Sequence, residues 1–370
     1  MTQNFVSSFF ITKYYIFKIK VLILQFYGNM RKAWHILLVM FVPLLLTESK
    51  LCAQDAPVYE QYVFDNTLLN PAFTGIVDLI EVKAAHRQQW IGFGPRNTPS
   101  TTFLMYRSRL KNRNGGIGGF LYTDKNGVNS QTGLQLNGSF QFLIRTNRKT
   151  RTILSFGFGA TVFMHTYDQT DFETDIYDPV IDYSQRNYYG YDANFGILFT
   201  HGGFLTGVSF DNLLQWTCPA YNLAMERATR INMNVHVGKI FWLTNHMQLC
   251  PLLIYKTNIK NMNQIDIGFK YKLMSGKKIR TVYTKDENEV IIGLTYKQTL
   301  DVGNLSPLSI SPMVGFTFKG ISISYLCELG LTGIQRYNYG SHQIALGYRW
   351  YRDKFTSLGK HNVASMVYDF

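Results

Sequence analysis

The amino-acid sequence predicts an all-β protein, a transmembrane outer-membrane β-barrel of about 14 antiparallel strands. Apolar and polar residues alternate with a period of two through most of the chain after residue 78, so each segment has one apolar face and one face of polar residues or glycine. The segments run about 9–13 residues, the length that a tilted strand needs to cross a bilayer. Aromatic residues gather at segment ends, where membrane interfaces would lie. A soluble sandwich also alternates, so strand length, aromatic ends and an export signal favour the barrel.

The first 53 residues are expected to be an export signal and not part of the fold. They contain a basic start at 30–32, an apolar run at 36–46 and the sequence LCA at 51–53 before Gln54. This order is typical of a secretory signal peptide that is cleaved after Ala53. The apolar run is too short to span a bilayer as a helix, which needs about 20 residues.

Two alternatives remain open at this end of the chain. Cleavage before Cys52 would produce a lipoprotein, although Leu51 is a poor match to the small residue expected there. We interpret Met30 as the true initiator, which makes residues 1–29 a mis-called start. Their run FFITKYYIF is a second candidate, for a membrane helix.

The stretch 59–75 is aromatic and rich in turns, without a helical or strand period. Its Asn70-Pro71 dipeptide disfavours the α conformation at Asn70 and indicates a turn before the first strand. The Tyr, Phe and Leu side chains of this stretch must be covered. We therefore expect residues 54–78 to form an N-terminal cap or plug that packs against the barrel, residues 79–351.

The alternation gives the residue ranges of the expected barrel strands. They are 79–90, 100–109, 116–123, 131–144, 152–165, 190–200, 203–211, 229–241, 247–257, 264–273, 278–285, 289–298, 308–318, 320–329 and 341–351. Because single-chain bacterial barrels have even strand numbers, we expect fourteen in the wall, with 278–285 the weakest. The closing strand should turn Ile344, Leu346, Tyr348 and Trp350 toward lipid, and Gln343 and Arg349 toward the lumen. The C-terminal tail 352–370 follows.

Composition excludes some partners and offers few sites for chemistry. The chain carries a net charge of +13, but no basic block is interleaved with aromatics, so nucleic acid is excluded as a partner. The spread of Lys and Arg instead suits anionic lipid headgroups or an acidic partner. Cys218, Cys250 and Cys327 are isolated and are expected to be small buried residues. We expect no catalytic, cofactor or metal site, because no known catalytic or metal motif is present.

Two polar clusters nevertheless allow a functional interpretation beside the structural one. The loop 165–184 carries Asp168, Asp171, Glu173, Asp175, Asp178 and Asp182. We interpret it as a solvated loop, with a partner-docking loop or a calcium site as alternatives, since its spacing fits no metal template. His86, Arg87, Gln88 and Trp90 are expected to form a polar network in the lumen against the N-terminal cap. The alternative is that His86 is the base of a serine–histidine pair. His165, His201, His236 and His342 are interpreted as network residues too.

Several motifs occur in a fixed order along the chain. They are NPAFTG at 70–75, RQQWIGF at 87–93 with TP at 98–99, GIGGFLYTDKNGVN at 116–129, NFGILFTHGGFLTGVSFDNLL at 194–214 and GSHQIALGYRW at 340–350. Together they resemble the PorP/SprF family, outer-membrane proteins of the type IX secretion system. Asp178-Pro179 matches a further loop element of that family, whereas the tail 352–370 departs from its pattern.

The resemblance implies a function that the alternation cannot give. It implies a non-enzymatic outer-membrane component that supports secretion or surface attachment of cargo proteins, in gliding and adhesion or in general secretion. The implied partners are a periplasmic ring lipoprotein and ring protein, the motor complex, and a large surface protein with a C-terminal sorting domain. The implied family-motif, plug or partner contacts are Asn70, Pro71, Arg87, Gln88, Trp90, Asp178 and Pro179. A substrate-specific porin and a lipid-modifying barrel enzyme remain the alternatives.

Overall fold

The computed structural model of the chain divides into two compact units, Met1–Lys50 and Leu51–Phe370. Everything described below belongs to the second unit. The structure describes Tyr62 and residues 65–77, 79–93, 98–110, 114–146, 151–170, 183–219, 229–244, 246–258, 262–275, 288–301 and 305–351. The expected signal segment 1–53, the weak candidate strand 278–285 and the tail 352–370 lie outside these residues.

The described part of the second unit is mainly β-sheet. Two single-turn 3-10 helices, η3 (Asn66–Leu68) and η4 (Pro71–Phe73), precede the sheet, and η5 (Gly333–Tyr337) precedes the last strand. The strands are β1 (Leu79–Gln88), β2 (Ser100–Arg109), β3 (Gly115–Asn126), β4 (Asn129–Thr146), β5 (Arg151–Asp168), β6 (Gln185–His201), β7 (Phe204–Asp211), β8 (Asn232–Lys239), β9 (Phe241–Trp242), β10 (Met247–Thr257), β11 (Asn263–Ser275), β12 (Asn288–Thr299), β13 (Pro307–Phe318), β14 (Ile321–Gly330) and β15 (Ser341–Tyr351). None of the helices in the described residues is long and apolar enough to cross a membrane.

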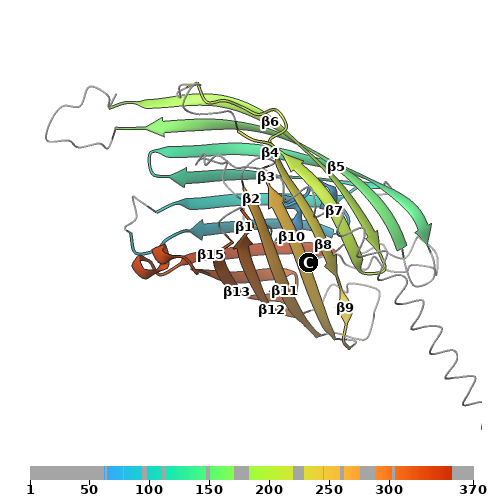
Figure 1. Ribbon diagram of the computed structural model, residues 1–370. Helices are drawn as coiled ribbons and strands as arrows, with labels where there is room; N and C mark the ends of the chain where they lie inside the picture. The colour runs from blue at the N-terminus through green and yellow to red at the C-terminus, as the bar shows by residue number, and fades with distance from the viewer. Residues whose placement is uncertain are drawn as a thin grey trace, which may run out of the picture. The chain divides into compact units, whose positions relative to one another are not determined.

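The sheet closes on itself into an antiparallel barrel (Figure 1). Apart from the short β9, each strand pairs with its neighbours in sequence, and β1 pairs with β15 from Leu79↔Tyr351 to Gln88↔His342. Closure matters because hydrocarbon offers no water to hydrogen-bond with backbone N–H and C=O groups, so a membrane-spanning sheet must pair them within itself.

The fifteen strands occupy fourteen strand positions in the barrel wall, which we call staves. Fourteen is the number that the sequence predicts. β8 and β9 both pair with β10 and are two parts of one stave. The break between them falls at Ile240, whose N–H donates to the carbonyl of Gly203 (2.8 Å). The described wall therefore has an even number of staves, as single-chain bacterial barrels do.

The connections separate into two ends of the barrel, since successive connections alternate between them. The loop end carries 89–99, 127–128, 169–184, 212–231, 258–262, 300–306 and 331–340, and the turn end carries 110–114, 147–150, 202–203, 243–246, 276–287 and 319–320. The turn end also holds the start of β1 and the end of β15. Bacterial barrels keep short turns in the periplasm and longer loops outside. The loop end is therefore the extracellular one.

Four neighbouring strands, β3 to β6, are longer by four residues or more than the sequence predicts. The largest difference is in β6, expected at 190–200, because the β5–β6 ladder continues through Thr166↔Asn187 to Asp168↔Gln185. The connection expected between the segments 152–165 and 190–200 is thus too long at both ends and shortens to 169–184. The extra residues are polar or aromatic on both faces, so no alternation marks them as strand. Figure 1 shows β4, β5 and β6 side by side as the longest arrows of the wall.

The two faces of the wall differ as the alternation predicts, with one informative exception. On β2, Phe103 and Met105 are buried on the inner face, whereas Leu104 and Tyr106 are exposed on the outer face. In β5, the residue that breaks the apolar alternation is Phe163, which lies on the buried face. Its ring packs edge-on against Trp216, with centroids 5.0 Å apart. The break therefore reflects packing within the barrel.

On the closing strand β15, Leu346 is 54% exposed and Gln343 is 2% exposed. We predict that Leu346→Arg lowers the free energy of unfolding by about 2–4 kcal/mol, because arginine on the lipid face near the bilayer midplane is that costly. The measurement is denaturant unfolding of the protein refolded in lipid vesicles. Gln343→Asn, on the opposite face, is the control and should change stability little. Equal losses in the two variants would show that the assigned phase is wrong.

Candidate functional site

The most unusual part of the molecule is the inner segment, residues 65–77, which is buried almost throughout. Its two helical turns begin at side-chain caps. The Asp65 carboxylate accepts a hydrogen bond from the N–H of Thr67 (2.8 Å), and the Asn70 Oδ1 accepts one from the N–H of Ala72 (2.8 Å). Asn70 is extended and Pro71 occupies the first helical position, as the Asn-Pro dipeptide predicts. Local sequence therefore determines the shape of the segment.

The inner segment is hydrogen-bonded to several strands of the wall. Asn70 Nδ2 donates to the carbonyls of Ile197 on β6 (3.1 Å) and Val208 on β7 (3.2 Å). Three serines of the wall donate back to the segment's carbonyls: Ser209 to Leu69 (2.6 Å), Ser155 to Ala72 (2.8 Å) and Ser139 to Thr74. Asn70 itself is fully buried. The segment therefore replaces water as the partner of polar groups on the inner face.

Glycines in the wall allow this close approach. A Cβ atom on Gly157 of β5 would run into the backbone of Pro71 and Ala72, and one on Gly196 of β6 would run into the Asn70 side chain. Glycine normally weakens a strand interior, and its presence often marks a close backbone approach. These two positions are therefore shaped for the inner segment.

Apolar side chains of the segment, and Tyr62 before it, pack against the wall. Leu69 and Tyr62 belong to a buried cluster that includes Phe103 and Met105 of β2. Phe73 lies against the imidazole of His236 on β8, with ring centroids 5.4 Å apart. Burial of a phenylalanine or leucine contributes about 1.5–3 kcal/mol. The segment is thus held by apolar packing as well as by hydrogen bonds.

A buried ion-pair network centres on Glu81 of β1. Arg107 of β2 donates from Nε to Glu81 Oε2 (2.6 Å), and Arg349 of β15 donates from Nε to Oε1 (2.8 Å). Asp65 of the inner segment joins this network through Arg107 (3.3 Å) and Lys83 (3.5 Å). Taking charges out of water is costly unless they are paired. The network therefore links the inner segment to the strands on both sides of the closing seam.

Two further ion pairs cross between strands that are not neighbours. Arg87 of β1 binds Glu328 of β14 (2.6 Å), which also accepts from Lys297 of β12 (2.8 Å). The strand β13 lies between β12 and β14 in the sheet, so this pair reaches across its inner face. On the neighbouring strand β11, Asp266 lies directly across the ladder from Lys297. It pairs with Lys256 (2.9 Å) and accepts from the hydroxyl of Tyr62 (2.5 Å). Charged side chains thus fill the interior around the inner segment.

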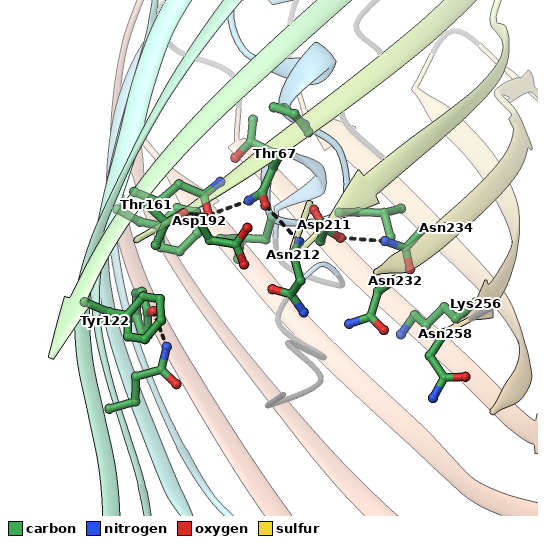
Figure 2. A pocket seen from close by; sticks show the side chains of 18 of the residues that line it. Thr67, Tyr122, Thr161, Asp192, Asp211, Asn212, Asn232, Asn234, Lys256 and Asn258 are labelled. Carbon is green, nitrogen blue, oxygen red and sulfur yellow. Dashed lines mark hydrogen bonds between the residues drawn. The ribbon is translucent and has the colours of Figure 1, made fainter. Parts of the chain in front are cut away.

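A pocket of about 120 Å³ remains between the inner segment and strands β3 to β8 and β10. Its lining is mostly amides, hydroxyls and carboxylates, including Thr67, Gln135, Thr161, Asp192, Asp211 and Asn234. Asn234 Nδ2 donates to Asp211 Oδ2 (2.8 Å), and Asn194 Nδ2 donates to Gln135 Oε1 (2.9 Å). Figure 2 shows side chains from the inner segment and from several strands around one space. Such a lining can hold polar or cationic groups by hydrogen bonds.

The polar cluster expected at His86, Arg87, Gln88 and Trp90 does not form one lumenal network. Arg87 is inside, but His86 is on the exposed face, where its Nδ1 contacts the hydroxyl of Thr102 (2.8 Å). Gln88 Nε2 donates to Thr98 Oγ1 (2.6 Å), and Trp90 is 41% exposed at the loop end. The expectation was wrong because successive strand residues point to opposite faces. His86 and Arg87 therefore cannot share a network.

The other predicted residues fall in several places. Ile344, Leu346, Tyr348 and Trp350 are all exposed on β15, and the rings of Tyr348 and Trp350 meet edge-on at 4.3 Å. Among the single histidines, His236 is fully buried, whereas His201 is exposed and contacts Thr152 (2.7 Å). Cys218 and Cys250 are buried and Cys327 is partly buried.

The first acidic residue of the loop 165–184 lies at the end of β5. Asp168 ends β5 and accepts from the N–H (3.0 Å) and hydroxyl (2.6 Å) of Thr170. Asp178, Pro179 and the other loop acids of 171–182 lie outside the described residues. Within the described residues, no group of three or more His, Cys, Asp or Glu side chains is arranged to hold a metal ion.

We predict that Gly157→Val displaces the inner segment without preventing barrel formation. The new side chain would occupy the space of Pro71 and Ala72. Limited proteolysis of the refolded protein should then cleave residues 65–77, which are protected in the parent protein. Gly138→Val on β4 is the matched control, because its Cβ meets nothing within 4 Å. Equal protection in both variants would contradict the close approach.

We also predict that Glu81→Ala lowers the free energy of unfolding by roughly 3–5 kcal/mol, because it removes the nearest carboxylate from the buried guanidinium groups of Arg107 and Arg349. These would keep the longer pairs with Asp65 (3.3 Å) and Glu289 (3.6 Å). Denaturant unfolding in lipid vesicles measures the change. His86→Ala on the outer face of the same strand is the control and should cost less than about 1 kcal/mol. A loss that is no larger in Glu81→Ala would show that water, and not Glu81, compensates the arginines.

Comparison with known proteins assigns this filled barrel to a family. A family model described as type IX secretion system membrane protein PorP/SprF matches residues 51–348. A search of curated proteins finds no match. Similar solved structures include a bacterial polysaccharide outer membrane secretin (10% identity, 74% of this chain and 99% of that chain, TM-score 0.36), the TodX deltaS2S3 mutant monoaromatic hydrocarbon channel (9%, 77% and 93%, 0.37) and an outer membrane channel from Pseudomonas putida F1 (8%, 74% and 96%, 0.34). These similarities are too distant to say anything of function. The match to the family model covers most of the chain, and the chain therefore belongs to the PorP/SprF family of type IX secretion system membrane proteins, as an integral outer-membrane β-barrel.

Proposed function

We propose that this protein is a non-enzymatic barrel that supports secretion or surface attachment of cargo by docking other proteins, with residues 54–78 closing its lumen. The single observation that carries the proposal is the filled interior. Asn70, Ser139, Ser155 and Ser209 bind the inner segment to four successive wall strands. A barrel filled in this way is suited to present surfaces, because a wide aqueous path would require these bonds to break.

Family membership implies association with other secretion components, and the two ends of the barrel suggest where each would bind. The turn end faces the periplasm, where we propose that the ring lipoprotein, the ring protein and the motor complex are contacted. The loop end carries the long connections 169–184 and 212–231. We propose that a large secreted surface protein with a C-terminal sorting domain docks there. Asp178 and Pro179 fall within the first of these connections and are proposed partner contacts.

The residue contacts favour this function over a lipid-modifying enzyme. His86, the histidine considered as a catalytic base, contacts a threonine hydroxyl on the outer face. The residue paired with His86 across the β1–β2 ladder is Thr102. Its secondary hydroxyl lies among apolar outer-face residues such as Leu104. The residue beside His86 is therefore a threonine and not the serine that the enzyme alternative requires.

We predict that deletion of the gene removes one or more proteins from the cell surface and leaves the uptake of small solutes unchanged. The measurement compares the surface proteomes of the deletion strain and of strains complemented with the parent gene or with Gly157→Val, beside a solute-uptake assay. The parent gene should restore the surface proteins. Gly157→Val should leak solutes or lose partner binding, because the inner segment is displaced. An unchanged surface proteome with reduced uptake of one solute would overturn the proposal and support a substrate-specific porin.

A further inference from the structure

The first half of β6 is a sheet edge. On one side β6 pairs with β5 along its whole length, from Gln185 to His201. On the other side, the described ladder with β7 covers only Phe195 to His201, because β7 is much shorter. Residues 185–194 of β6 therefore continue past the end of β7, at the extracellular loop end of the barrel.

The direction of the free backbone groups follows from one hydrogen bond. The carbonyl of Ala193 accepts from the N–H of Leu213 (3.1 Å), which lies on the side away from β5. In an antiparallel ladder both backbone groups of a residue point to the same side, and successive residues alternate. Tyr191, Tyr189 and Asn187 thus direct their N–H and C=O groups away from β5. Within the described residues, no hydrogen bond to these six groups is present.

Between its two flanking charges, Arg186 and Asp192, this edge lacks the features by which proteins protect sheet edges. Natural edges are guarded by charged side chains, prolines or bulges. The stretch 187–191 reads NYYGY, without a charge or a proline, and its register with β5 has no shift. Tyr189 and Tyr191 are 77% and 68% exposed. An unguarded edge of this kind is a template for pairing with another strand.

We propose that residues 187–191 of β6 are a strand-addition site for an extended, cationic segment of a second protein outside the cell. A polypeptide strand is the ligand that matches N–H and C=O groups at two-residue spacing. The site rests on backbone geometry and does not depend on the proposed role in secretion.

Charge beside the edge explains why the added strand should be cationic. Asp192 follows the edge on the inner face, and its Oδ1 accepts from the N–H groups of Ala193 (2.7 Å) and Leu214 (3.1 Å), while its Oδ2 has no hydrogen-bond partner within the described residues. Asp211 lines the same pocket. A residue of the added strand opposite Gly190 would point to this face, and diagonal cross-strand neighbours are within reach of long side chains. Lysine or arginine at that position would pair with Asp192.

The test uses the purified full-length protein in detergent micelles and an octapeptide of alternating valine and lysine as the probe. Hydrogen exchange of single amides is measured with and without the peptide. In the free protein, the amides of Asn187, Tyr189 and Tyr191 should exchange fast, whereas those of Tyr188 and Gly190, which face β5, should be protected. The peptide should slow the first three. The same peptide with glutamate in place of lysine should bind about tenfold more weakly, as lost pairing with one carboxylate predicts.

A proline variant separates pairing at the edge from other binding. Tyr189→Pro removes an N–H that points away from β5, and proline is tolerated on edge strands where the N–H faces outward. The barrel should stay folded while peptide affinity falls about tenfold. Tyr189→Phe is the matched control and should bind as the parent does.

Three results would overturn the proposal. Slow exchange at Tyr189 and Tyr191 in the free protein would mean that the edge is already covered. Deletion of residues 220–228 and light scattering would then show whether the chain itself or a second copy covers it. Unchanged affinity of Tyr189→Pro would place the peptide elsewhere. Equal binding of the lysine and glutamate peptides would remove the cationic preference.

Discussion

The carboxylate of Glu81 lies at the seam where the first and last strands close the barrel. It accepts hydrogen bonds from Arg107 on β2 and Arg349 on β15, the two strands that flank β1. The strand β1, whose backbone closes the sheet, therefore also carries the carboxylate that binds the buried arginines of the interior. Asp65 of the inner segment reaches this cluster through Arg107 and Lys83. Closure of the wall and placement of the inner segment are thus stabilised by one set of buried charges, and loss of Glu81 or Asp65 would take one counter-charge from both Arg107 and Lys83.

A barrel of fourteen staves must either admit water or fill its interior. Here the inner face carries serines, glycines and charged residues at the positions that the inner segment touches. The serines donate to the segment's carbonyls, and glycines such as Gly157 and Gly196 leave room for its backbone. The polar face that the alternation reveals is therefore complementary to a specific stretch of the same chain. Polar residues on an inner face do not by themselves indicate a pore.

The sequence predicts those parts of the structure that depend on period two and on the lipid environment. Strand phase on β15, the fourteen staves and the turn at Asn70-Pro71 follow from alternation, even strand number and proline geometry. The long ends of β4 to β6 could not be predicted, because outside the bilayer neither face needs to be apolar and the period disappears. Some ion pairs of Glu81 and Glu328 join residues that are more than two hundred positions apart in the sequence. The pair of Arg87 and Glu328 is one of them. Only the closed topology brings them together, and no local pattern marks them. The residues of the cluster at 86–90 are adjacent in sequence, but strand alternation turns His86 and Arg87 to opposite faces, so they do not form one network.

The pocket beside β6 is bordered both by the inner segment and by Asp192, which follows the free edge of β6. Thr67, Leu69 and Pro71 of the inner segment form one side of it, while Asp192 and Asp211 form the other. Asp192 directly follows the free edge of β6, and Asn70 is bonded to Ile197 further along the same strand. The edge and the inner segment therefore share β6 as a common support. A side chain that entered the pocket from an added strand would touch the inner segment without crossing the wall. The extracellular edge and the part of the chain that fills the lumen thus border the same pocket.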